Sequence, residues 1–319
     1  MVQEFQKAAH MNYKRIINSV LQEDTSLPPV LIYEHEKTKV YRIDLPTPLI
    51  LRILEGDTSS QEYRAALQSE LAADDDLTSK ILYWETREIN KQPHGIQIQT
   101  FIPGEPIDQF PNKDESQAVV RAVYTLHQRL SQATERIGTN SAANIHALIN
   151  QIMPAVRDCP IKTAAAKLLA QPRYHELISQ PEQTLIYGDL WYKNLLLERN
   201  GSETVVRFVD IDPLVLGPAI LQPAILFSSY FLFTKLLFEP NAMDTFNLGK
   251  YLSFWPESLN EFDMFLMMLV FPVGLGLLKE FQISQNGDLD PQIHQATMEP
   301  FEQSIAFLNK YRTARNYPM

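Results

Sequence analysis

The sequence predicts an α+β protein with two lobes, a small N-terminal lobe built on an antiparallel sheet and a large C-terminal lobe that is mainly helical. The first reason is length: 319 residues suggest two domains at about 150 residues per domain. The second is a hydrophobic share of 45%, enough for two cores. The third is that strand-like runs give way to helical periodicity near residue 104. We therefore assign residues 1–104 to the first lobe and residues 105–319 to the second.

The first lobe is predicted to open with a helix over residues 1–24, where apolar residues recur at helical spacing. Short runs rich in β-branched and aromatic residues follow, and turn residues such as proline divide them. A stretch rich in Glu and Ala lies between the third and fourth runs and predicts one helix. The expected strands are residues 30–34, 39–44, 49–54, 81–88 and 95–102, and the expected helix is residues 61–73.

The second lobe is predicted to be helical except for one hairpin. Residues 116–131 place four apolar residues on one helical face: Val119, Val123, Leu126 and Leu130. The hairpin is expected from residues 195–198 and 204–212, because the Asn200-Gly201 pair between them is a strong signal for a tight turn.

Two uncharged runs must be compared with membrane spans, which need about 20 predominantly apolar residues in one helix. Residues 213–234 are long enough, but three prolines, Gln222 and a pair of serines interrupt them. Residues 264–278 are too short, at 15 residues. We therefore expect buried core helices in both places and no membrane partner.

The charge and the cysteine content argue against several classes of protein. A net charge of −10 is unfavourable for a protein that binds nucleic acid through its phosphates. The single cysteine, Cys159, excludes a disulfide framework and fits a reducing compartment. The N-terminal residues lack the apolar core of a signal peptide. We expect a cytoplasmic protein without a nucleic-acid partner, and the sequence leaves the oligomeric state open.

Three polar side chains that flank the predicted hairpin are the candidates for a reactive site. Asp189 and Asn194 precede its first strand, and Asp210 lies near the end of its second strand. Because a hairpin returns the chain to its starting point, these residues can converge despite their separation in sequence. Asp and Asn oxygens suit Mg²⁺ and a second carboxylate suits a general base, which together meet the needs of phosphoryl transfer. The alternative is that the three residues cap turns.

The same segment resembles a known family. YGDLWYKN, FVDID and LGPA, all within residues 187–219, are similar to the signature of the aminoglycoside phosphotransferase and choline kinase-like superfamily, whose members have a protein-kinase-like fold. The form GDLW-x-x-N is most similar to the fructosamine kinase and ecdysteroid kinase-like branches. The resemblance implies ATP as the donor, Mg²⁺ as the metal and a hydroxyl of a small molecule as the acceptor. It also implies that Asp189 is the catalytic base and that Asn194 and Asp210 bind the magnesium.

The resemblance extends into the first lobe. The segment FIPGEPI is similar to the family's link between the lobes, whose backbone lies near the adenine, so its first residues Phe101 and Ile102 are expected to contact the nucleotide. The run LILRIL is similar to the strand that supplies a basic residue to the phosphates, which here is Arg52. On the following helix Glu62 is the expected acidic partner of Arg52, and Glu70 is the alternative.

Three departures from the family pattern leave a second interpretation open. The family usually has a histidine where Tyr187 stands, and an aromatic residue with a hydrogen-bonding tip can take over its structural role. The first hairpin, YEHEKTKV, contains no glycine to form a phosphate-covering loop. Pro218 replaces an aspartate that is common after the family's late glycine. The alternative to a small-molecule kinase is therefore a catalytically degraded member of the fold that binds nucleotide or serves as a scaffold.

The last part of the chain bears on the acceptor. Residues 236–319 contain ten acidic and five basic residues. In enzymes that the chain resembles, this region helps to form the acceptor pocket, and an acidic pocket favours a cationic acceptor such as an aminosugar or a choline-like amine. The alternative is an ordinary acidic surface, and the identity of the acceptor stays open at this point.

Overall fold

A computed structural model describes residues 18, 29–35, 37–56, 59–72, 77–89, 91–137, 143–180, 182–201, 203–211, 214–239, 241–286 and 290–318. The chain divides into two compact units, Met1–Pro103 and Gly104–Met319. The helix expected over residues 1–24 lies outside the described residues, apart from Asn18.

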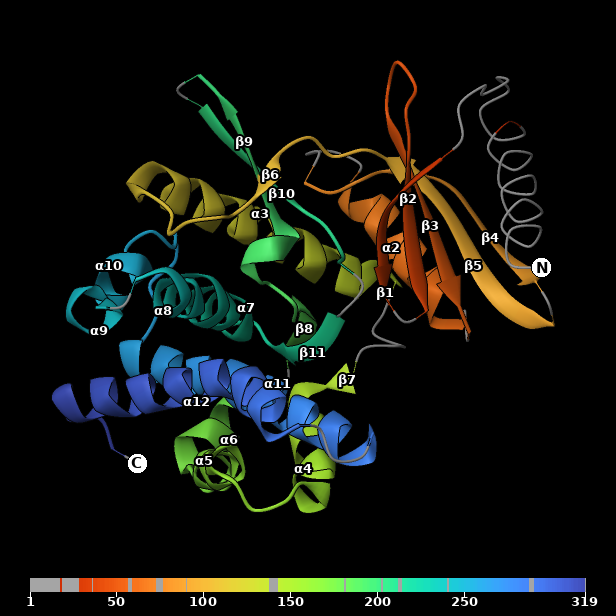
Figure 1. The fold of residues 1–319 in the computed structure, drawn as a ribbon. Helices are drawn as coiled ribbons and strands as arrows, with labels where there is room; N and C mark the ends of the chain where they lie inside the picture. The colour runs from red at the N-terminus through yellow and green to blue at the C-terminus, as the bar shows by residue number, and fades with distance from the viewer. Residues whose placement is uncertain are drawn as a thin grey trace. The chain divides into compact units, whose positions relative to one another are not determined.

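The N-terminal unit is built on one antiparallel sheet of five strands in the order β1-β2-β3-β5-β4 (Figure 1). One helix, α2 (Ser59–Leu71), lies between β3 and β4 in the chain. The strands are β1 (Val30–His35), β2 (Thr38–Ile43), β3 (Leu49–Glu55), β4 (Ile81–Ile89) and β5 (Gln92–Thr100). These elements confirm the five strands and the helix expected from the sequence, because β-branched and aromatic residues suit a pleated, half-buried surface.

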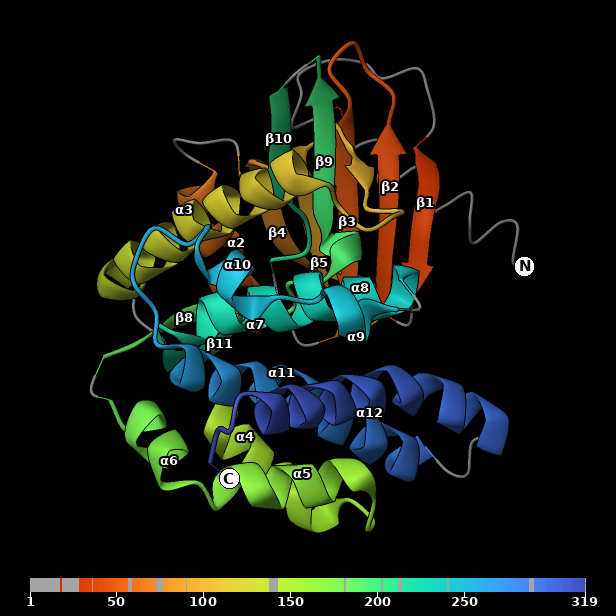
Figure 2. The ribbon, with the colours of Figure 1, turned by 90° about the vertical axis from the view of Figure 1, so that its left-hand side faces the viewer.

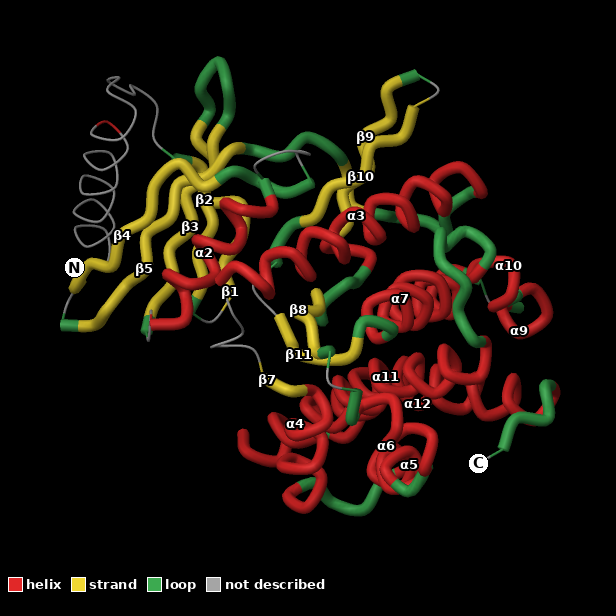
Figure 3. The backbone as a smooth tube through the Cα atoms, turned by 180° about the vertical axis from the view of Figure 1, so that it is seen from behind, coloured by secondary structure: helices red, strands yellow, loops and turns green. Residues whose placement is uncertain are grey.

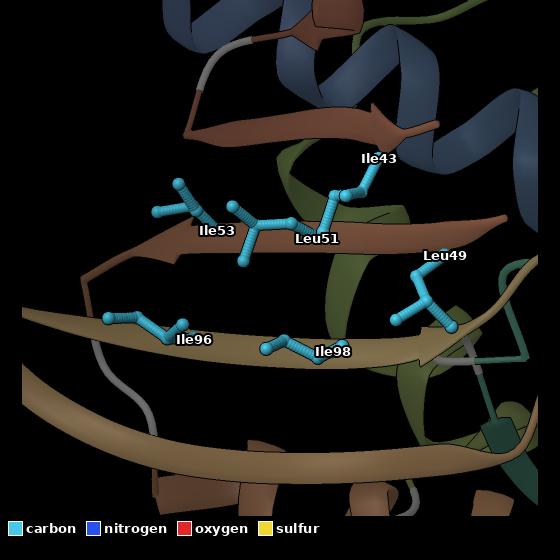
Figure 4. Packing of buried hydrophobic residues seen from close by; sticks show 6 residues of the cluster. All are labelled: Ile43, Leu49, Leu51, Ile53, Ile96 and Ile98. Atoms are coloured by element: carbon cyan, nitrogen blue, oxygen red, sulfur yellow. The ribbon is translucent and has the colours of Figure 1, made fainter. Parts of the chain in front are cut away.

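The two faces of this sheet differ in character. Directly opposite residues of an antiparallel pair share a face, so the register shows which side chains lie together. One face carries an apolar core whose six residues lie side by side on β2, β3 and β5 (Figure 4): Ile43, Leu49, Leu51, Ile53, Ile96 and Ile98. Leu51 of this face lies opposite Ile98 in the register. The next residue along β3, Arg52, points to the other face and lies opposite Gln97. The alternation of the strand therefore keeps Arg52 off the apolar core.

The C-terminal unit contains two small sheets of three strands each, drawn in yellow in Figure 3. The first has the order β10-β9-β6 and contains the expected hairpin, formed by β9 (Leu195–Asn200) and β10 (Glu203–Phe208). Gly201 follows β9 with a φ of 66°, a left-handed conformation that glycine adopts readily in a tight turn. Because β10 ends at Phe208, Asp210 lies in the following loop and not in the strand.

The sequence analysis did not predict the other strands of these two sheets. The second sheet has the order β7-β11-β8, and in it Leu214 lies opposite Tyr187. The unpredicted strands are β6 (Glu105–Pro106), β7 (Ala143–Asn144), β8 (Gln183–Tyr187) and β11 (Leu214–Pro218). Each has two to five residues, which is too short for hydrophobic periodicity to identify a strand.

Gly104 begins the C-terminal unit at a position that requires glycine. Its φ is 120°, and a Cβ atom there would lie 3.2 Å from the backbone of Leu197. The close approach allows the next residues, β6, to pair with β9. The segment FIPGEPI is therefore fixed at its C-terminal end by a sheet as well as by covalent connection.

Helices form most of the C-terminal unit, as the sequence predicted. The long helix α11 is central, since it packs against α4, α5, α7 and α12 (Figure 2). The helices are α3 (Lys113–Ile137), α4 (Ile145–Ile152), α5 (Pro160–Leu169), α6 (Pro172–Ile178), α7 (Leu221–Ile225), the π-helix η3 (Leu226–Phe233), α8 (Thr234–Phe238), α9 (Ala242–Thr245), α10 (Leu248–Leu252), α11 (Glu261–Asn286) and α12 (Pro291–Ala314). Two short 3₁₀ turns, η1 (Met153–Ala155) and η2 (Tyr192–Asn194), complete the unit.

Two helical stretches of the described residues are long and apolar enough to cross a membrane: Leu221–Phe238 and Glu261–Gln285. Within the fold, 83% of the first and 78% of the second is buried. A packed core helix passes the same length and composition test. Their burial agrees with the core helices expected from the sequence.

Candidate active site

The hairpin brings its two flanking segments together. The short turn η2 leads from Asp189 into β9, and Leu195 at the start of β9 lies opposite Phe208 at the end of β10. One residue further out, the backbone N–H of Val209 donates to the carbonyl of Asn194 at 3.0 Å. Asp210 follows directly, so the structure places its backbone at the same end of the hairpin as Asn194.

Asp189 and Asn194 are joined by hydrogen bonds across the loop. The side-chain Nδ2 of Asn194 donates to the Asp189 carboxylate at 2.9 Å and to the Asp189 backbone carbonyl at 3.0 Å. Since the amide nitrogen takes both contacts, the carbonyl oxygen of the same amide points away from Asp189. That oxygen is the atom that Asn194 can offer to a metal ion.

The electrostatics of Asp189 reflect both burial and a neighbouring charge. Burial raises the pKa of its carboxyl group above the ordinary value, and the negative charge of Asp210 raises this pKa further. The hydrogen bond from Asn194 and the positive charge of Lys279 lower it. Two carboxylates therefore repel each other in a partly buried place, an arrangement that a cation stabilises.

The donor atoms at this end of the hairpin fit a hard divalent cation. Mg²⁺ prefers oxygen ligands and is usually held by one or two carboxylates, with waters and phosphate oxygens as its other ligands. Asp210 and the Asn194 carbonyl oxygen would be the protein's contribution. No group of three or more His, Cys, Asp or Glu side chains suited to a metal occurs in the described residues.

Asp210 has a strained backbone. Its φ of 58° is the left-handed conformation, which is uncommon for residues other than glycine, although Asp tolerates it better than most. Such conformations persist only where the surrounding structure imposes them, and they are frequent at functional sites. No sequence pattern predicted this feature.

Tyr187 fixes the segment that carries Asp210. Its ring is fully buried, and its hydroxyl donates to the backbone carbonyl of Val209 at 2.8 Å. The sequence analysis expected an aromatic residue with a hydrogen-bonding tip to replace the family's histidine in bracing the metal-binding segment. The contact with Val209, the neighbour of Asp210, is of that kind.

Sequence reasoning missed two buried polar residues that touch the same loop. Gln222, on α7, accepts a hydrogen bond from the backbone N–H of Tyr187 at 2.9 Å. Ser229, on η3, donates to the carbonyl of Leu190. Both are 0% exposed. The signal that could have found them is their polarity within the uncharged run 213–234, because a buried polar side chain needs a partner.

In the N-terminal unit the structure places three of the predicted residues and leaves one open. Arg52 is half-buried on β3. The backbone N–H of Phe101 donates to the carbonyl of Pro48 at 3.2 Å, and Ile102 is 8% exposed. The side chain of Glu62 lies outside the described residues, and Glu70 is exposed on α2. The pairing of Arg52 with either glutamate stays a prediction.

The sheet face that bears Arg52 also carries an amide cluster, formed by Gln68, Ser79, Gln97 and Gln99. The side-chain nitrogen of Gln68, on α2, donates to the Ser79 hydroxyl at 2.6 Å and to the Gln99 amide oxygen at 3.2 Å. The side-chain nitrogen of Gln97 donates to the same oxygen at 2.8 Å. The cluster therefore ties α2 to β5 through neutral groups that satisfy one another.

Many acidic residues of the region 236–319 are already engaged within the fold. Asp263 forms an ion pair with Arg173 at 2.7 Å, and the buried Glu280 contacts Arg157 and His294. Others that form ion pairs or hydrogen bonds are Glu239, Glu257, Glu261, Asp290 and Glu299. Seven of the ten acidic residues thus form ion pairs or hydrogen bonds within the fold, and the preference for a cationic acceptor stays a prediction.

A separate hollow of about 290 Å³ opens between α5, α11 and α12. Leu168, Leu266 and Ile305 form part of its apolar wall, and Lys167 and Glu302 also line it. None of the predicted site residues lines this hollow. It is therefore distinct from the end of the hairpin that holds Asp189.

Comparison with known proteins adds to this geometry. No family model and no curated protein matches the chain. Solved structures do. An amicoumacin kinase in complex with AMP-PNP, Ca²⁺ and Ami is 15% identical over 88% of this chain and 88% of that chain, with a TM-score of 0.63. The choline kinase LicA from Streptococcus pneumoniae is 12% identical over 95% of this chain and 100% of that chain, with a TM-score of 0.64.

A third similar structure is the GDP complex of wild-type aminoglycoside 2'-phosphotransferase-IIIa, which is 14% identical over 93% of this chain and 98% of that chain, with a TM-score of 0.63. The chain has the fold of these small-molecule kinases. The kinase-like fold confirms the fold class expected from the resemblance, with an antiparallel sheet in the N-terminal region and helices in the C-terminal region. At these identities the likeness establishes the fold, and the chemistry must be argued from the site.

Proposed function

We propose that the protein is a small-molecule kinase that transfers the terminal phosphate of ATP to a hydroxyl group. The observation that carries this proposal is the convergence at the end of the hairpin. Asp189 and Asn194 share a hydrogen bond, and the return of β10 brings Asp210 to the same end, where its charge acts on Asp189. A carboxylate beside two oxygen donors for a metal is what phosphoryl transfer requires.

Each predicted residue has a role in this proposal. Asp189 accepts the proton of the acceptor hydroxyl, whose oxygen then bonds to the terminal phosphorus as the bond to ADP breaks. Asn194 and Asp210 hold Mg²⁺, which when bound neutralises charge on the phosphates. Arg52 binds the donor phosphates, as a wide planar cation in place of the usual lysine. Phe101 and Ile102 contact the base of the nucleotide.

The similar structures support the proposal at the level of chemistry. All three are described as kinases or phosphotransferases, one in complex with AMP-PNP and Ca²⁺ and another with GDP. Amicoumacin, choline and aminoglycosides, after which these enzymes are named, are small molecules. A nucleotide, a divalent cation and a small hydroxyl compound are therefore the ligands to test first on this chain.

The proposal is tested by the melting temperature of the protein with ATP, with and without Mg²⁺, followed by a screen of hydroxyl compounds for ADP release. We expect ATP to raise the melting temperature, and Mg²⁺ to increase this effect. Asp189→Asn should keep the stabilisation and lose turnover by about 10²- to 10⁴-fold, the usual contribution of a general base.

Asp244→Asn is a matched control, because Asp244 is an exposed aspartate on α9. This variant should keep wild-type turnover. Two results would contradict the proposal. If ATP did not change the melting temperature, the proposal that the protein binds ATP would be wrong. If ATP stabilised the protein but no acceptor in the screen supported turnover, the protein would be a degraded member of the fold.

A further inference from the structure

We infer that Ser229 is a positioning residue for Asp189. It holds the backbone of the loop that carries Asp189, called the catalytic loop below, against the buried helix 221–238. The role in catalysis rests on the proposed function; the structural role does not. Ser229 is 0% exposed and lies in η3, the π-helical part of that helix. π-Helical segments inside α-helices are rare overall, but those that occur frequently lie at functional sites.

The hydroxyl of Ser229 contacts a backbone carbonyl that would otherwise need another hydrogen-bond donor. It contacts the carbonyl oxygen of Leu190, the residue directly after Asp189, and the carbonyl oxygen of Ile225 at 2.6 Å. Leu190 is 0% exposed, so water is a poor substitute partner for its carbonyl. Loss of the hydroxyl should therefore make the loop backbone move to find a partner, and Asp189 would move with it.

A second contact anchors the other side of Asp189 to the same helix. The side-chain oxygen of Gln222 accepts from the backbone N–H of Tyr187 at 2.9 Å, and its nitrogen approaches the Tyr187 carbonyl at 3.5 Å. Tyr187 and Leu190 bracket Asp189, which lies between them with Gly188. The carboxylate is thus held between two fixed points of the backbone and not by side-chain contacts alone.

Ser228 provides a matched control within the same helix. It is the neighbour of Ser229 and is 1% exposed, but its hydroxyl has no hydrogen-bond partner. Ser228→Ala and Ser229→Ala remove the same atom from the same buried segment. Only the second variant removes a contact with the catalytic loop, so any difference between them measures that contact.

The first readout is hydrogen exchange of the backbone amides of residues 190–194, which needs no enzyme activity. Ser229→Ala should raise the exchange rate of these amides, and Ser228→Ala should leave it at the wild-type level. The second readout is steady-state kinetics. Ser229→Ala should lower kcat by about 10- to 100-fold, the size expected when a reacting group is misplaced, with the KM for ATP within twofold of wild type.

The outcomes separate this inference from the proposed function. Equal exchange rates in Ser228→Ala and Ser229→Ala would overturn the anchoring role, whether or not the protein turns over an acceptor. Faster exchange in Ser229→Ala with an unchanged kcat would overturn its positioning role in catalysis. If the wild type itself shows no turnover, the proposed function fails, and the exchange data still decide whether Ser229 anchors the loop.

Discussion

Two polar clusters of this protein, one in each unit, satisfy their atoms in opposite ways. In the amide cluster of the N-terminal unit the side chains are neutral, and Gln68 and Gln97 both donate to the side-chain oxygen of Gln99. In the C-terminal unit, burial raises the pKa of Asp189 and the negative charge of Asp210 raises it further, so the two acidic groups do not satisfy each other. The first cluster is complete by itself, and the second gains from an added cation.

The two clusters suit different roles in the protein. Neutral amides that pair fully in a low-dielectric interior fix the positions of the elements that carry them. Adjacent carboxylates cost free energy until a positive charge arrives, which is the property expected of a metal site. We therefore expect the stability of the first cluster to be independent of Mg²⁺ and the properties of the second to depend on it.

The largest expected effect comes from removing one negative charge of the second cluster. Asp210→Asn keeps the size of the side chain but weakens its affinity for a hard cation, because a neutral amide replaces a carboxylate. We expect turnover to fall by at least about 100-fold and the Mg²⁺-dependent part of the stabilisation by ATP to disappear. Thermal melts with ATP, with and without Mg²⁺, and a coupled ADP assay measure both quantities.

Asp244→Asn again serves as the control, since it removes the same charge from an exposed position on α9. An Asp210→Asn variant that kept its full response to Mg²⁺ would show that the cation binds elsewhere. In that case the contrast between the two clusters would have no functional meaning.

The next effect concerns the amide cluster. Gln68→Leu removes the donor to the hydroxyl and the backbone carbonyl of the buried Ser79 and leaves these acceptors without it, at a cost of about 1–3 kcal/mol in the free energy of unfolding. Urea unfolding with and without Mg²⁺ measures this cost, which should be the same in both conditions. A loss that changed with Mg²⁺ would contradict the separation of the two clusters.

The sequence could predict the second cluster because its residues belong to one local unit. Asp189, Asn194 and Asp210 flank a hairpin that the Asn200-Gly201 pair predicts. The convergence of the three residues therefore followed from the geometry of the turn alone. The amide cluster joins Gln68 on α2 to Ser79 and to Gln99 on β5, 11 and 31 residues away, and no local pattern specifies which polar side chains meet there.

Two features of the site could not be predicted from the sequence. The left-handed backbone of Asp210 is imposed by its surroundings, because Asp has no strong preference for that conformation. Ser229 reaches Leu190 because the helix widens into a π-helix, and propensity does not predict where such a change occurs. The pairing of Arg52 with Glu62 stays a prediction, because the side chain of Glu62 lies outside the described residues.

A smaller effect is expected from Tyr187, which lies two residues before Asp189 and contacts Val209, the neighbour of Asp210. Tyr187→Phe removes only the hydroxyl that donates to the carbonyl of Val209. We expect a loss of about 0.5–1.5 kcal/mol in the free energy of unfolding, as for one hydrogen bond, and a higher Mg²⁺ concentration for half-maximal turnover. A Mg²⁺ titration of the rate tests the second part. If stability fell but the Mg²⁺ requirement did not change, the contact would brace the core and not the metal segment.

The smallest effect extends the comparison to a buried group that is neutral but can acquire a charge. The Nδ1 atom of His127, on α3, is buried without a hydrogen-bond partner, and burial lowers the pKa of this ring despite the opposing charge of Glu257. The unfolded chain then takes up a proton at a higher pH than the folded protein does.

The contribution of His127 to the free energy of unfolding is therefore present above its unfolded pKa of about 6.5 and is lost as the pH falls towards the lower, folded pKa. His127→Gln cannot titrate, so the difference in stability between pH 7.5 and pH 5 should be smaller in this variant than in the wild type. Urea unfolding at the two pH values measures that difference. An identical difference in both proteins would assign the acid sensitivity to other groups, and it would mean that the ring of His127 takes up a proton as readily in the folded protein as in the unfolded chain.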